Sequence, residues 1–161
     1  MDADICREHL QKLIVEESAQ LHRLEGLLER EHELLLANDV EELDRAGVAR
    51  QECFGALMRI EDERRQLCRM MSVPEGLEGL ERLLNWCDPS RELQRRWADC
   101  AELAGRCRAL NDRNGALVAA RLKKVEGMLE VLTGRAAQSG VYGRRGDYQI
   151  AGRSERVLAT V

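Results

Sequence analysis

Histidine and cysteine are the residues of this chain that most readily suggest chemistry, because imidazoles and thiolates bind metals and act as bases or nucleophiles. All three histidines, His9, His22 and His32, lie near the N-terminus. Glu29-x-x-His32 has the spacing of a di-iron ligand pair, but such a site needs a second pair and no histidine follows His32. Cys6-x-x-His9 could supply half of a zinc site, but no Cys-x-x-Cys or similar pair supplies the other half. We therefore predict neither a metal site nor a cofactor.

The cysteines are predicted to be core residues. They are spread along the chain as Cys6, Cys53, Cys68, Cys87, Cys100 and Cys107. Cys100 and Cys107 share a helix face but lie about 10 Å apart along it, too far for a disulfide. The N-terminus lacks the basic and apolar segments of a signal peptide. We expect a cytoplasmic protein whose cysteines stay reduced and pack as small apolar residues.

Signatures of known enzymes are missing from the sequence. It contains no P-loop and no Gly-x-Ser-x-Gly, and Gly143-Arg-Arg-Gly146 lacks the Lys-Ser/Thr that a phosphate cradle needs. A nucleophile–base pair would have to join one of the N-terminal histidines to a distant cysteine. We predict that the protein has no catalytic residues and is not an enzyme. A stoichiometric bound metal would reopen that question.

The composition predicts an all-α fold. The chain is 44% hydrophobic and 34% charged, but only 3% aromatic and with two prolines, which does not suit a β-sandwich or barrel. The apolar runs are short, four residues at 34–37 and five at 116–120, against the roughly 20 that a membrane span requires. The net charge of −4 argues against nucleic acid as a partner. We expect no stable membrane insertion.

The first two predicted helices form an antiparallel hairpin. Residues 2–37 carry an uninterrupted apolar stripe at helical spacing. Asn38-Asp39 breaks the pattern, and Asp39-x-x-Glu42 resembles a capping box that begins a second helix at 40–71. Because the connection is so short, the second helix must return along the first.

Two further helices are predicted, at 75–87 and at 89–133. Asp88 is the expected N-cap of the last helix, with Pro89 at its first position, and Thr133-Gly134 is its expected end. The fold class is therefore an antiparallel hairpin plus a long helix, forming an elongated coiled coil or bundle over residues 1–134.

Two asparagines interrupt the apolar face of the long helix. Asn111 and Asn114 stand where the heptad pattern calls for apolar side chains. Buried polar residues at such positions commonly fix the register of packed helices. We predict this structural role, or the anchoring of a loop, in preference to a ligand site.

Residues 135–161 form a C-terminal tail of different composition. Residues 134–161 hold five of the 13 glycines and five arginines against two acidic residues, net +3, whereas residues 1–133 hold 27 acidic against 20 basic residues, net −7. A partly flexible tail of this kind can bury its scattered apolar residues against a partner, where Tyr and Arg are favoured anchors. Packing of part of the tail on its own helices is the alternative.

Three short motifs resemble those of a known family. They are Asn111-x-x-Asn114-Gly115, Leu132-Thr133-Gly134 and Tyr142-Gly143-x-x-Gly146. Together with the helical hairpin, they make essentially the whole chain similar to the FlgN family of bacterial flagellar export chaperones. Six cysteines are more than the pattern of that family leads us to expect.

The resemblance implies a non-enzymatic chaperone with its binding site in the C-terminal region. Members bind the terminal helical segments of the hook-associated proteins, prevent their premature assembly and bring them to the flagellar type III export apparatus. Here this points to partner-binding residues Tyr142, Gly146, Tyr148, Ile150, Val157 and Leu158. The alternative is a structural coiled-coil tether that forms a homodimer through its leucine stripes.

Overall fold

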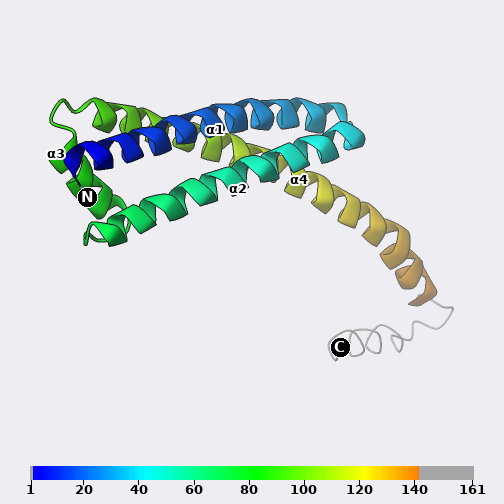
Figure 1. Ribbon diagram of the computed structural model, residues 1–161. Coiled ribbons are helices and arrows are strands. Elements are labelled where there is room, and N and C mark those ends of the chain that lie inside the picture. The colour runs from blue at the N-terminus through cyan, green and yellow to red at the C-terminus, as the bar shows by residue number, and fades with distance from the viewer. Residues whose placement is uncertain (1, 142–161) are drawn as a thin grey trace. The chain divides into compact units, whose positions relative to one another are not determined.

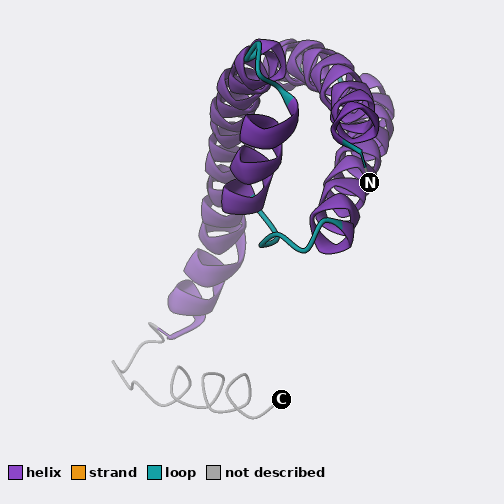
Figure 2. Ribbon diagram, turned by 60° about the vertical axis from the view of Figure 1, so that its left-hand side comes forward, coloured by secondary structure: helices purple, strands orange, loops and turns teal. Residues whose placement is uncertain are grey.

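The computed structural model describes the backbone of residues 2–141 and the side chains of residues 2–133. This part of the chain forms four helices and no strand, so the predicted all-α class is confirmed (Figures 1 and 2). The chain divides into two compact units, residues 1–116 and residues 117–161. We call the first unit the body. The predicted boundary at residue 134 remains a prediction.

Two long helices form the predicted hairpin. Helix α1 spans Ala3–Ala37 and helix α2 spans Val40–Met70. Asn38 ends α1 in the left-handed conformation, and the Asp39 side chain accepts a hydrogen bond from the Glu42 backbone N–H at 3.2 Å, as the capping box predicts. The two helices lie side by side along most of their length (Figure 1).

Ion pairs across the hairpin show that α1 and α2 are antiparallel. Glu31 accepts two hydrogen bonds from Nη1 of Arg50, at 2.8 and 3.0 Å. Near the other end, Nη2 of Arg64 lies 2.8 Å from a carboxylate oxygen of Glu17. Glu31 is buried, so its charge needs this partner, whereas the exposed pairs of the hairpin are screened by solvent and contribute little.

Helix α3, Leu77–Cys87, lies beside the N-terminal end of α1 (Figure 1). It begins two residues later than predicted, because Gly76 has a φ of 97° and cannot belong to a right-handed helix. Gly79 is buried directly under the preceding loop: a Cβ built on it would lie 1.7 Å from the carbonyl oxygen of Pro74. The loop can cover this end of the body only because residue 79 has no side chain.

Helix α4, Glu92–Val141, differs from its prediction at both ends. It does not begin at Pro89, because Arg91 has a φ of 56°, which lies outside the helical region. It also does not stop at Thr133-Gly134: the Thr133 hydroxyl donates to the Leu129 carbonyl within the helix, and a glycine inside a helix costs only about 1 kcal/mol.

The core of the body collects side chains from all four helices. Its buried members are Cys6, Leu10, Ile14, Leu21, Leu24 and Leu28 from α1, Cys53, Leu67 and Cys68 from α2, Leu80, Leu83, Leu84 and Cys87 from α3, and Leu93, Cys100, Leu103 and Cys107 from α4. Every cysteine is buried and unpaired, so the prediction that cysteines pack in the core is confirmed.

Candidate functional site

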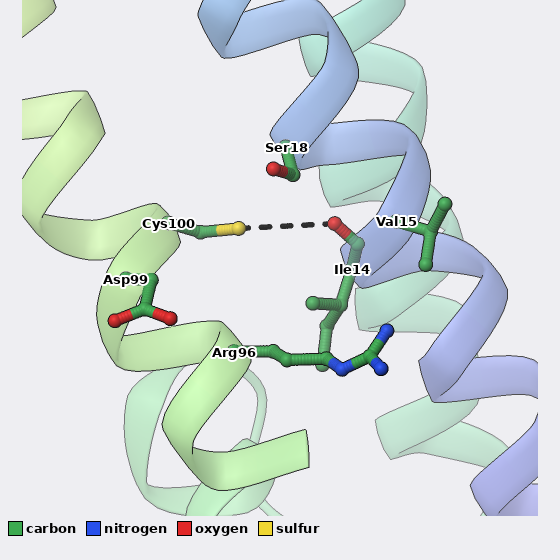
Figure 3. A pocket seen from close by; sticks show the side chains of 6 residues that line it. All are labelled: Ile14, Val15, Ser18, Arg96, Asp99 and Cys100. Carbon is green, nitrogen blue, oxygen red and sulfur yellow. Dashed lines mark hydrogen bonds between the residues drawn. The ribbon is translucent and has the colours of Figure 1, made fainter. Parts of the chain in front are cut away.

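The N-terminal half of α4 packs on α1 through three hydrogen bonds at heptad spacing. Sγ of Cys100 lies 3.7 Å from the Ile14 carbonyl oxygen, and Sγ of Cys107 lies 3.4 Å from that of Leu21. One heptad further, Nδ2 of Asn114 donates to the Leu28 carbonyl oxygen at 2.8 Å, completing the series Ile14/Cys100, Leu21/Cys107 and Leu28/Asn114. Since the residue numbers on α1 and on α4 both increase by seven from one bond to the next, the two helices run parallel. Figure 3 shows the first of these bonds.

Asn114 is the most constrained polar residue of this seam. It is 1% exposed, and its side-chain oxygen lies 3.1 Å from Nδ1 of His32. Because the amide nitrogen already donates to Leu28, the amide oxygen is the acceptor and Nδ1 of His32 carries the proton. Both ends of a buried amide are thus satisfied in one register only, and this supports the register role that the sequence suggests for Asn114.

Asn111 has a different environment. It is exposed at the edge of an apolar hollow of about 270 Å³, which we call the α2–α4 groove. The groove has a floor of α1 residues and walls of α2 and α4 residues: Leu21, Leu24, Leu28, Phe54, Leu57, Ala104, Cys107, Arg108 and Asn111. Asn111 therefore lies at the surface of the body rather than inside the seam.

A second hollow, of about 260 Å³, lies between α1 and α4 and is more polar. Figure 3 shows Ser18, Arg96 and Asp99 around it, beside the Cys100–Ile14 contact. Arg96 also donates to the Glu92 side chain at 2.9 Å, so its charge is already compensated. This hollow carries no set of groups that favours a particular ligand.

Asp88 organises the corner between α3 and α4. Its buried carboxylate accepts hydrogen bonds from the backbone N–H groups of Leu93, at 2.8 Å, and Gln94, at 3.2 Å, and from the Ser90 hydroxyl at 2.9 Å. It thus caps α4 from outside the helix. Burial raises the pKa of Asp88, but the hydrogen bonds from Gln94, Ser90 and Leu93 outweigh it, and the pKa is lowered overall. The corner holds a charged carboxylate at neutral pH.

Five of the buried thiols ionise less readily than an exposed cysteine. Burial, assisted by the neighbouring Cys87, raises the pKa of Cys6 to about 12. Burial likewise raises the pKa of Cys68, Cys87, Cys100 and Cys107. The thiolate is the reactive and metal-binding form. Within residues 2–133, no cluster of three or more His, Cys, Asp or Glu side chains is arranged to hold a metal ion.

Beyond the body, α4 presents an apolar face to solvent. Five residues alternate at spacings of four and three and are 47–70% exposed: Val118, Leu122, Val125, Leu129 and Leu132. We call them the α4 stripe. Such spacing places all five side chains on one face of the helix, as in one strand of a coiled coil. A continuous exposed apolar face of this kind marks an interaction surface.

The sequence-predicted partner residues Tyr142, Gly146, Tyr148, Ile150, Val157 and Leu158 lie outside the described residues. The residues of the α4 stripe do not stand out in the sequence, because they continue the periodicity of the packed part of α4. The feature that could have indicated the stripe is the length of the last helix compared with the two helices of the hairpin. At 50 residues, α4 is longer than α1 with 35 or α2 with 31, so the hairpin cannot cover it fully.

Comparison with known families shows to which protein family the chain is related. A family model described as FlgN protein matches residues 1–150, which includes the whole body and the α4 stripe. No curated protein and no solved structure matches the chain. In the described part, no helix combines the length and apolarity needed to cross a bilayer. The chain belongs to the FlgN family of flagellar export chaperones.

Proposed function

We propose that the protein binds hook-associated proteins in the cytoplasm, prevents their premature assembly and delivers them to the flagellar export apparatus. The α4 stripe is the observation that carries this proposal. An amphipathic client helix laid along five exposed apolar residues would bury its own apolar face, as in other helix-pairing complexes. Tail residues Tyr142 to Leu158 would extend the contact, and no catalytic step is involved.

The stripe supports a chaperone role because its side chains are largely unburied in the free protein, so most of their burial free energy is still available for binding. Fully burying a Leu or Val side chain contributes about 1.5–3 kcal/mol, which these residues can still provide on binding. A client that covers the stripe is itself protected from self-association until it is released.

The test measures binding of a purified hook-associated protein to the full chain and to two single variants. Leu122→Asp places a charge in the stripe and is expected to weaken binding at least tenfold. Ala120→Asp adds the same charge on the same helix, away from the stripe, and is expected to bind like the parent. Equal binding by all three proteins would remove the stripe from the client site.

A chain ending at Gly134 tests the contribution of the tail. All core residues of the body precede this position, so its helical circular dichroism is expected to persist. Weaker binding would assign Tyr142, Tyr148 and their neighbours to the client site. Undiminished binding would restrict the site to the helices.

A homodimeric tether is the competing proposal, because the heptad spacing of the α4 stripe also suits pairing with a second copy. Sedimentation of the full chain without client separates the two. A dimer that Leu122→Asp dissociates, with no binding of hook-associated proteins, would favour the tether.

A further inference from the structure

The α2–α4 groove is an incomplete helix-packing site on the body. Helices α2 and α4 both pack against α1, and the groove runs between them over an α1 floor made by Leu21, Leu24 and Leu28. These floor residues are spaced three and four apart, so the floor extends for about two helical turns, roughly 10 Å. In a four-helix arrangement, this position belongs to a further helix.

The size and walls of the groove fit inserted side chains. Its volume of about 270 Å³ is close to the lower end of the range of roughly 300–1,000 Å³ typical of small-molecule sites. Phe54 and Leu57 on α2 are only partly buried, and Ala104 on α4 is exposed. Apolar side chains three or four residues apart on another helix could therefore reach the α1 floor and complete the burial of Phe54 and Leu57.

The charge at the rim specifies the chemistry of the partner. Arg108 lines the groove, and within residues 2–133 it forms no ion pair, whereas the nearby Arg106 is paired with Glu25 at 2.9 Å. A guanidinium beside apolar surface favours a carboxylate over any other side chain. Asn111 adds a neutral amide on the same rim.

We propose that the α2–α4 groove binds an amphipathic helix of another protein, which inserts apolar side chains between α2 and α4 and pairs a glutamate or aspartate with Arg108. This site is separate from the α4 stripe, so it would let the body engage one helix while the stripe holds another. It does not depend on the identity of the client.

The test uses two synthetic 18-residue helical peptides with leucines at positions i, i+3, i+4 and i+7. One carries glutamates beside the leucine face and the other carries lysines. Binding is measured by fluorescence anisotropy to the full chain carrying Leu122→Asp and Leu129→Asp, so that the α4 stripe does not bind the peptides. The glutamate peptide is expected to bind at least tenfold more tightly than the lysine peptide.

Arg108→Glu in the same background is expected to reverse this order, because the rim charge changes sign on an exposed position without altering the core. Ala104→Gln places a larger side chain in the groove and is expected to weaken binding of the glutamate peptide at least tenfold. Ala109→Gln, an exposed alanine of α4 outside the groove, is the control and is expected to bind like the parent. The proposal would be overturned if the glutamate peptide still bound more tightly than the lysine peptide to Arg108→Glu, or if Ala104→Gln left binding unchanged.

Discussion

Two stretches of α4 carry the same apolar periodicity and differ in what covers it. In the body, Cys100, Leu103 and Cys107 are 3–4% exposed, because they face α1. From Val118 to Leu132, residues at equivalent spacing are 47–70% exposed. Periodicity alone therefore identifies an interaction face, and burial separates the part used for folding from the part available to a partner.

The largest expected effect tests this difference directly with one substitution on each side. Leu103→Ala removes a buried side chain and leaves a cavity, so it should lower the free energy of unfolding by about 3 kcal/mol. Leu129→Ala removes an exposed side chain and should change it by less than about 0.5 kcal/mol. Urea denaturation followed by circular dichroism measures both. Equal effects would mean that the α4 stripe is covered in the free protein.

Two glycines extend the same contrast to the backbone. Gly79→Ala would push a methyl group against the Pro74 carbonyl and should cost about 2 kcal/mol, as overpacking does. Gly105→Ala meets no atom within 4 Å and should stabilise α4 by about 0.5–1 kcal/mol. Thermal melts of both variants show whether each substitution raises or lowers stability. A Gly79→Ala variant as stable as the parent would show that the loop at Pro74 moves away.

The two asparagines give a smaller, similarly paired test. Asn114→Ala should cost about 1.5 kcal/mol, because it breaks the bond to Leu28 and leaves His32 without its acceptor. Asn111→Ala, at the exposed rim of the groove, should be close to neutral. The same urea measurement applies. If both variants lose stability equally, Asn114 has no special place in the α1–α4 seam.

The smallest effect concerns pH. The pKa of Asp88 is lower in the folded chain than in the unfolded chain, so its contribution to stability is complete above the unfolded pKa, near 4, and is lost as the pH falls through the folded value. Asp88→Asn should cost about 1 kcal/mol at pH 7, because both carboxylate oxygens of Asp88 accept hydrogen bonds and the amide keeps only one of these acceptors. The difference between Asp88→Asn and the parent should shrink below about pH 4. A constant difference from pH 7 to pH 3 would contradict the assignment.

Much of the fold could be predicted from local signals. The capping box at Asp39 and the break at Asn38 fixed the hairpin, because both are short-range features. Local rules were less accurate at the start of α4. Asp88 does bond the first turn of α4, but the left-handed Arg91 displaces the helix start beyond Pro89, and no sequence pattern signals that conformation.

The relation of α4 to α1 could not be predicted in the same way. A heptad stripe has the same sequence pattern whether the helix that it packs against runs parallel or antiparallel to it. The direction became evident only from contacts such as Cys107 with the Leu21 carbonyl, in which a side chain bonds to main chain that carries no sequence information. The α2–α4 groove has the same origin, since Phe54, Leu57 and Arg108 come together only once that direction is set.

The parallel seam also has a consequence for the order of folding. Ile14, Leu21 and Leu28 meet their α4 partners across 86 residues of chain, whereas the ion pair of Glu31 with Arg50 closes only 19. Contacts between residues distant in the chain form slowly because a long loop must be closed first. During synthesis from the N-terminus, the hairpin is therefore complete while α4 is still being made. Until α4 docks, the hairpin exposes the α1 surface around Ile14, Leu21 and Leu28 on which α4 later packs.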